Sequence, residues 1–120
     1  MAYCNIMRLM DMASWQSQLR KGAAELVLLT VLSRGEAYGL EILARIRSAG
    51  ELVSEGSLYP LLNRLEKAGR IIGRWDLPAE GGNPRKYYRL TDEGAALAEA
   101  MRAAWIDFRT TITTLVEDQP

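Results

Sequence analysis

The sequence has no histidine and only one cysteine, Cys4, among its 120 residues. A disulfide bond needs two thiols, structural zinc sites use several thiolate or imidazole ligands, and most acid–base catalysis near neutral pH uses histidine. One chain therefore cannot form a disulfide framework or a zinc site of this kind, and we identify no catalytic residue, metal or cofactor. A lone thiol is typical of the reducing cytoplasm, and we interpret Cys4 as a buried or unstructured residue rather than a redox sensor.

Long hydrophobic runs are missing as well. The longest run, Leu26 to Leu32, is interrupted by Thr30 and is much shorter than the roughly 20 residues that span a bilayer. The first 13 residues contain no sustained apolar block followed by a small-residue cleavage site. We therefore expect no transmembrane helix, no secretory signal and no membrane partner.

An excess of charge of one sign is also absent, because 15 Lys and Arg side chains balance 15 Asp and Glu. Balanced charge ordinarily argues against binding to nucleic acid. The charges are segregated, however, since residues 15–90 hold 12 basic and 8 acidic side chains, whereas residues 91–120 hold 2 basic and 6 acidic ones. This distribution fits a basic contact module joined to an acidic segment that faces elsewhere.

The composition that remains, 48% apolar and 25% charged, is that of a small globular domain, alone or with an oligomerising arm. Apolar residues at helical spacing predict a first helix over residues 18–34, which ends at Gly35. A second predicted helix covers residues 38–46 and begins with Tyr38. Both helices should bury an apolar face against a common core.

A third helix is predicted to end at Gly69, with leucines at positions 58, 61, 62 and 65 on its inner face. Ser54 and Ser57 are both suitable caps for its start. Pro60 has no amide hydrogen, which is harmless only in the first turn of a helix. Either the regular helix begins near Ser57, or its early turns are distorted.

The second half of the chain predicts a hairpin and one long helix. Residues 71–77 and 85–90 are rich in β-branched and aromatic side chains and flank a tip with two glycines and two prolines. Thr91 is the predicted cap of the final helix. Apolar residues then recur at a coiled-coil-like spacing at Leu97, Met101, Ala104, Trp105, Phe108, Ile112, Leu115 and Val116.

Three helices followed by a hairpin is the order of a winged helix-turn-helix, whose third helix enters the major groove while the hairpin flanks it. We therefore predict a mainly α protein with a small β-hairpin. The predicted organisation has an N-terminal leader at residues 1–14, for which flexibility is one interpretation, and a winged-helix DNA-binding domain at residues 15–90. Residues 91–120 are predicted to form a C-terminal dimerisation helix.

Three ordered motifs add to this interpretation: Tyr-Gly-Leu-Glu-Ile at 38–42, Gly-Ser-Leu-Tyr-Pro-Leu-Leu-Asn-Arg-Leu-Glu-Lys-Ala-Gly at 56–69, and Pro-Arg-Lys-Tyr-Tyr-Arg-Leu-Thr-Asp-Glu-Gly at 84–94. Together they closely resemble the PadR family of bacterial transcriptional regulators, over roughly residues 19–101. The single C-terminal helix is similar to that of the shorter subfamily, whereas the segment before Trp15 departs from the pattern. The resemblance implies a dimeric, usually repressing, DNA-binding protein whose C-terminal helix packs against the partner chain, and not an enzyme.

The outer face of the third helix carries the candidate DNA-binding residues Ser57, Tyr59, Asn63 and Arg64. An asparagine can pair with the edge of an adenine, and an arginine with guanine or with a phosphate. The alternative is an ordinary solvated helix face.

The hairpin carries the candidate phosphate ligands Arg85 and Lys86, beside a glycine-rich tip that has the mobility expected of a wing. Basic residues also occur on hairpins without any such role. Tyr38, next to Gly39 at a helix start, places its hydroxyl on a phosphate in one interpretation and is a core aromatic with a polar tip in the other.

The seam of the last helix is the predicted dimer interface. One small domain cannot cover its apolar residues alone, and the predicted interface residues are Leu97, Met101, Ala104, Trp105, Phe108, Ile112 and Leu115. The family resemblance adds that an aromatic residue on this helix can line a cavity for a small planar aromatic effector, formed here by Trp15, Trp105 and Phe108. The simpler alternative is that the Trp105 indole only fills the interface.

Together with what the family resemblance implies, these patterns support a homodimeric repressor that binds double-stranded DNA at a palindromic operator, and the resemblance adds release by such an effector. The main alternative is a winged-helix module that binds proteins and never contacts DNA. An enzyme is disfavoured, because the glycine pair at residues 81–82 lacks the lysine and the following helix of a phosphate-binding loop.

Overall fold

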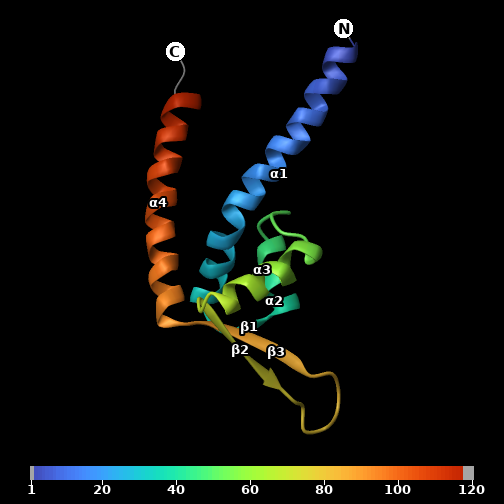
Figure 1. The fold of residues 1–120 in the computed structure, drawn as a ribbon, viewed down its shortest axis with the longest axis vertical. Helices are drawn as coiled ribbons and strands as arrows, with labels where there is room; N and C mark the ends of the chain where they lie inside the picture. Colours follow the sequence, from blue (N-terminus) through green and yellow to red (C-terminus); the bar gives the residue numbers. More distant parts are fainter. Residues whose placement is uncertain (1, 118–120) are drawn as a thin grey trace.

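The computed structural model describes the backbone of residues 2–117 and the side chains of residues 11–117. The environment predicted for Cys4 therefore lies outside the described side chains. The elements follow in the order α1 (Ala2–Ser33), β1 (Ala37–Tyr38), α2 (Gly39–Arg47), α3 (Glu55–Lys67), β2 (Ile71–Asp76), β3 (Arg85–Leu90) and α4 (Asp92–Val116). The molecule measures 62 × 33 × 25 Å, because α1 and α4 project in the same direction, away from the hairpin (Figure 1). Within the described residues, four helices and a small antiparallel sheet form the predicted, mainly helical winged-helix fold.

Helix α1 begins much earlier than the predicted helix at residues 18–34. It starts at Ala2 and continues without interruption to Ser33, so that residues 2–14, which we separated as a leader, are helical. Neither glycine nor proline occurs before Gly22, and the sequence therefore has no strong helix breaker in this stretch. An amphipathic pattern was the basis of the prediction, and it detects only the part of a helix that packs on its own domain.

The sheet has three strands in the order β1-β3-β2, rather than the two of the predicted hairpin. The added strand β1 pairs Ala37 with Tyr88 and Tyr38 with Tyr87. Tyr38 is thus extended and serves as the N-cap residue of α2, not as the first residue of a helix as predicted. A strand of two residues is too short to show an alternating pattern, and only its pairing with β3 identifies it.

Helix α3 begins at Glu55, and its cap is Ser54, whose Oγ accepts a hydrogen bond from the Ser57 amide at 3.1 Å. Pro60 lies in the second turn of this helix, which continues regularly to Lys67. The helix ends in a Schellman motif, in which the Arg70 amide donates to the Leu65 carbonyl and a left-handed glycine, Gly69, follows the cap. The helix is therefore well defined at both ends.

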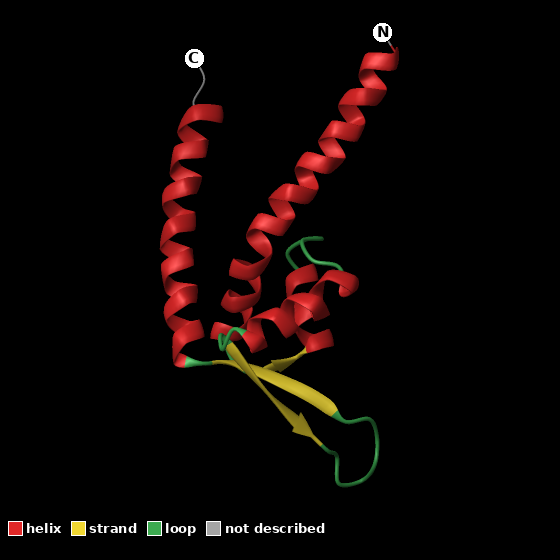
Figure 2. Ribbon diagram, in the orientation of Figure 1, coloured by secondary structure: helices red, strands yellow, loops and turns green. Residues whose placement is uncertain are grey.

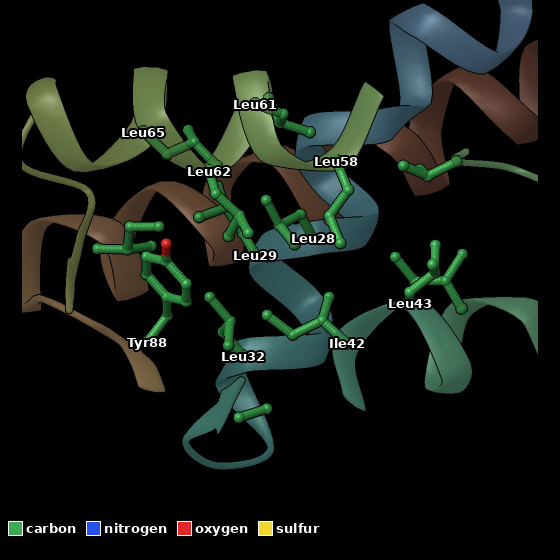
Figure 3. Packing of buried hydrophobic residues seen from close by; sticks show 14 of the residues in the cluster. Leu28, Leu29, Leu32, Ile42, Leu43, Leu58, Leu61, Leu62, Leu65 and Tyr88 are labelled. Atoms are coloured by element: carbon green, nitrogen blue, oxygen red, sulfur yellow. The ribbon is translucent and has the colours of Figure 1, made fainter. Parts of the chain in front are cut away.

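The hydrophobic core lies between α1, α2, α3 and the inner face of the sheet. Figure 3 shows the leucines of α3 directed towards Leu28, Leu29 and Leu32 of α1, with Tyr88 of β3 closing one side. The predicted inner leucines of α3 are all buried, and Leu58 and Leu62 have no exposed surface. This core packs α3 against the inner face of the sheet.

Helix α4 is tied to the end of α3 at its first turn. The Thr91 Oγ1 atom donates to the Gly69 carbonyl at 2.7 Å and accepts from the Gly94 amide at 3.0 Å, so that the predicted cap also joins the two segments. The backbone approaches so closely that a β-carbon at Gly94 would collide with the Arg70 carbonyl oxygen. Beyond Met101, α4 leaves the core, and the free ends of α4 and α1 diverge from each other (Figure 2). Neither helix has the length and apolar character of a membrane span over the residues that the structure describes.

Candidate nucleic-acid interface

The exposed face of α3 carries all four DNA-binding residues that were predicted on this helix. Ser57, Tyr59, Asn63 and Arg64 are exposed, while the leucines of the same helix are buried. Within the described part of the chain, the side chains of Asn63 and Arg64 form no hydrogen bond or ion pair, so their donors are free for a ligand. Ser57 differs, because its Oγ accepts a hydrogen bond from Ser54 Oγ at 3.0 Å in the helix cap.

Tyr59 packs across the start of α2. A β-carbon at Gly39 would lie 2.8 Å from the Tyr59 hydroxyl and 2.9 Å from its ring, so the tyrosine could keep this position only beside a glycine and would have to shift otherwise. The Tyr-Gly pair that the sequence analysis singled out therefore has a packing role in addition to any contact with DNA. Tyr59 remains 44% exposed, and because it lies four residues before Asn63, the two residues share one side of α3.

The outer face of the sheet holds a row of stacked aromatic and basic side chains. The Arg85 guanidinium lies 4.7 Å from the ring centre of Tyr38, whose ring meets that of Tyr87 edge-on at 5.4 Å. The Arg74 guanidinium lies 4.9 Å from the Tyr87 ring, and Glu36 binds Arg74 through both carboxylate oxygens. Tyr38 is thus a half-buried member of this row and does not belong to the hydrophobic core.

The ion pair at the end of this row shifts the titration of both partners. The hydrogen bond from Arg74 lowers the pKa of Glu36 below its usual range, and the same bond raises the pKa of Arg74. Both groups therefore remain charged over the whole physiological pH range, and the row stays intact there.

Lys86 points in the opposite direction from Arg85, because successive side chains of a strand lie on opposite faces. Its Nζ atom donates to Glu66 Oε1 on α3 at 2.9 Å and lies 5.3 Å from the ring centre of Tyr88. The hydrogen bond to Glu66 raises the pKa of Lys86. The two basic residues that the sequence analysis treated as one pair of phosphate ligands therefore occupy different environments, and only the Arg85 guanidinium is exposed.

A groove of about 820 Å³ runs between the start of α2, Tyr59 of α3 and the hairpin. It is lined by the tip glycines Gly81 and Gly82, both at positive φ, and by Trp75, which is 63% exposed. Sequence reasoning missed Trp75. Its alternation with Gly73 and Ile71 in β2 was the available signal, since it places all three on the face towards α3.

A second groove, of about 670 Å³, lies between α1 and the start of α3. Arg20 and Lys21 of α1 line it together with Arg64 of α3, so that three exposed basic residues border this groove beside α3. Arg20 and Lys21 were also missed from the sequence, although two adjacent basic residues within the predicted first helix were a visible signal.

A third, largely apolar pocket of about 500 Å³ separates α1 from α4. It brings together Trp15 of α1 and both Trp105 and Phe108 of α4, the three residues predicted to line an effector cavity. The ring centres of Trp105 and Phe108 are 6.3 Å apart. The three rings remain about half exposed, because the pocket is open on one side.

The predicted dimer seam divides into two parts. Leu97 and Met101 pack against the core of their own chain, whereas Phe108 and Ile112 are exposed. The remaining seam residues, Ala104, Trp105 and Leu115, are exposed as well. Among side chains 11–117, no three carboxylates or thiols come close enough together to hold a metal ion.

Comparison with known proteins identifies the same family as the sequence motifs. The model of the transcriptional regulator PadR-like family matches residues 28–100. Among curated proteins, a transcriptional regulator of Mycobacterium tuberculosis is 33% identical over 87 residues, which cover 72% of this chain and 79% of the relative.

Several solved structures with the same fold come from this family. A PadR-like transcriptional regulator from Bacillus cereus is 36% identical and superimposes with a TM-score of 0.76, over 85% of this chain and 99% of the other. A PadR family transcriptional regulator from Eggerthella lenta is 33% identical, with a TM-score of 0.75 and coverage of 99% of both chains. The second match includes almost the whole of the present chain.

Proposed function

Since the chain belongs to the PadR-like family of transcriptional regulators, we propose that it is a homodimeric repressor that binds a palindromic operator in double-stranded DNA. Family membership makes it a DNA-binding regulator rather than an enzyme. The observation that carries the finer proposal is the free polar face of α3, which is flanked by a basic groove on one side and by the hairpin on the other. Such a regulator acts in the cytoplasm, where the chromosome lies.

In this proposal α3 lies in the major groove. Asn63 pairs with an adenine edge and Arg64 with guanine or with a phosphate, because their donors have no partner among the described side chains. Ser57 and Tyr59 contact the backbone beside them. Arg20 and Lys21 of α1 add positive charge in the groove beside α3, where they attract the phosphates of the duplex.

The hairpin contacts the flanking backbone in the same proposal. Arg85 is its phosphate ligand, and the Tyr38 ring beneath the guanidinium holds it in place. The Tyr38 hydroxyl serves as a second donor to a phosphate. Lys86, already paired with Glu66, is not assigned this role.

A second copy of the chain covers the exposed seam of α4. Phe108 and Ile112, together with Trp15 of α1, are too large and apolar to remain in water along two extended helices. A symmetric dimer presents two copies of α3 and therefore recognises inverted half-sites about 10 bp apart, centre to centre, or a multiple of this distance.

The test is selection of bound sequences from random duplexes, followed by binding titrations at several salt concentrations. Arg64→Ala should change the preferred sequence if the side chain contacts a base, and Arg85→Ala should weaken all duplexes and lower the salt dependence by roughly one phosphate contact. Arg102→Ala, which removes an exposed charge from α4, is the matched control and should do neither. A wild-type protein that binds no duplex would favour the protein-binding module instead.

The pocket between α1 and α4 supports a regulatory addition to this proposal. We assign it to a small planar aromatic effector, which stacks on Trp105 and Trp15 and favours the arrangement of the dimer that does not bind DNA. In a Trp75→Phe background, the two remaining tryptophans both line this pocket. Planar aromatic compounds should quench their fluorescence and weaken DNA binding together. If a broad panel of such compounds changes neither, Trp105 only fills the interface.

A further inference from the structure

The hairpin is tied directly to the recognition helix by one partly buried ion pair. Lys86 of β3 donates to Glu66 in the last turns of α3 at 2.9 Å, and the two side chains are only 28% and 29% exposed. An ion pair that is partly withdrawn from water holds its partners more firmly than an exposed pair does. This contact therefore restrains the angle between the wing and α3.

The residues around the Lys86–Glu66 pair leave room for the lysine and cover its ammonium group. Lys86 reaches α3 by crossing β2 at Gly73, where a β-carbon would collide with Lys86 Cε and lie 3.0 Å from Glu66 Oε2. The rings of Trp75 and Tyr88 lie 6.0 and 5.3 Å from the ammonium and cover its flanks. The absence of a side chain at Gly73 thus provides the path that the lysine takes.

This environment conflicts with a role for Lys86 as a phosphate ligand. An ammonium that is neutralised by a carboxylate at 2.9 Å attracts a phosphate weakly and releases few counterions when DNA binds. Its neighbour Arg85, exposed on the opposite face of the strand, has no acidic partner among the described residues. Two adjacent basic residues therefore have separate functions.

We propose that Lys86, Glu66 and Gly73 form a latch that fixes the wing relative to the recognition helix, so that Lys86 is a positioning residue for DNA binding. Simultaneous contact of α3 with the major groove and of the wing with the flanking backbone requires a fixed distance between them. A loose wing must be ordered when the complex forms, which lowers the affinity. The effect on DNA rests on the proposed function, whereas the effect on the wing itself does not.

The first experiment measures the affinity for a selected duplex as a function of salt for wild type, Lys86→Met, Glu66→Gln and the double variant. The latch predicts that each single substitution weakens binding by a similar factor, roughly three- to tenfold, and that the double variant is no worse than either. It also predicts an unchanged salt slope. Gly73→Ala, which alters no charge, should produce the same loss.

Glu66→Gln distinguishes the latch from direct phosphate binding. If Lys86 binds phosphate, removing the acid releases the lysine and strengthens DNA binding, while Lys86→Met lowers the salt slope by about one contact. Either result would overturn the proposal. Glu55→Gln, at an exposed acid of the same helix with no ion-pair partner among the described residues, shows how much any lost negative charge on α3 changes the affinity.

Amide hydrogen exchange of the free protein tests the latch without DNA. Lys86→Met and Glu66→Gln should both speed exchange in β2 and β3 and leave the amides of α1 unchanged. If wild type binds no duplex but these variants loosen the strands, the repressor proposal fails and the latch stands. If exchange in the strands is unchanged, the latch fails whatever the DNA measurements show.

Discussion

The winged-helix core and the two helical arms, which are the parts of α1 and α4 that project from this core, bury apolar surface to very different extents. In the core, Leu28, Ile42 and Leu62 have no exposed surface, although the domain is small. In the arms, Trp15 is 54% exposed and Phe108 is 57% exposed, although these residues are at least as large. One chain thus completes its DNA-binding unit but leaves its arms without a covering partner.

The difference indicates where each part of the molecule obtains its stability. A core that is closed within one chain depends on its own packing, whereas an exposed apolar seam becomes stable only when a second surface covers it. Substitutions in the core should therefore act independently of protein concentration, and those in the arms should act through association. The following predictions test this contrast.

The largest effect is expected in the core. Leu62→Ala should lower the free energy of unfolding by about 2 to 5 kcal/mol, because it leaves a cavity that the surrounding leucines cannot fill. Ile112→Ala in the seam is the matched comparison. Denaturant unfolding at several protein concentrations should show a constant loss for the core variant and a concentration-dependent loss for the seam variant. If the loss of unfolding free energy depended on protein concentration in the same way for both variants, the contrast between the two regions would be wrong.

The contact between the start of α4 and the end of α3, which joins the two regions, should be nearly as sensitive to substitution. Gly94→Ala should cost about 1 to 3 kcal/mol, because the added carbon collides with the Arg70 backbone, which cannot move without disturbing the end of α3. Gly22→Ala is the control, since a β-carbon there meets nothing within 4 Å in the middle of α1. This second variant should stabilise the protein by roughly 0.5 to 1 kcal/mol. Thermal unfolding should show a lower melting temperature for Gly94→Ala and a higher one for Gly22→Ala than for the wild type.

Association should respond to charge in the seam. Ile112→Asp should weaken the dimer by roughly tenfold or more, because the interface would bury an unpaired carboxylate. Thr110→Asp, on the opposite side of α4, should leave association unchanged. Sedimentation over a range of concentrations compares the two, and a wild-type protein that remains monomeric at micromolar concentration would contradict the premise.

The smallest effect is expected at the outer face of the sheet. Arg74 lowers the pKa of Glu36 in the folded protein, so the stabilisation is present above the unfolded pKa of about 4.3 and is lost as the pH falls through the lower folded value. Because the pair is exposed, the loss should be small. The difference in unfolding free energy between wild type and Glu36→Gln should therefore shrink below about pH 4. A difference that is constant down to pH 2.5 would show that the pair contributes nothing.

Most of the helical framework could be predicted from local sequence patterns. The leucines of α3 lie inside as their spacing indicates, and Thr91 caps α4. Gly69 ends α3 through the left-handed conformation that glycine adopts easily. These features could be predicted because a period, a cap or a stop is determined by residues that are only a few positions apart.

Other features depend on segments that are distant in the sequence. Strand β1 exists only because the edge of β3 pairs with Ala37 and Tyr38. The first half of α1 shows no pattern directed at its own core, and the prediction therefore omitted it. Trp75 and the pair Arg20 and Lys21 acquired a possible role only when the fold placed them beside α3.

By itself, the sequence determined the family, the order of the helices and the hairpin, and the polar face of α3, since motifs and periodicities are properties of short segments. Only the tertiary structure decided that Arg85 and Lys86, adjacent in the chain, have different partners. Strand alternation sends one side chain to each face, and Glu66 meets Lys86 only because α3 packs on the inner face of the sheet beside a glycine. The function of a charged side chain depends on which charges lie within a few ångströms of it, and that distance is set by packing between remote segments.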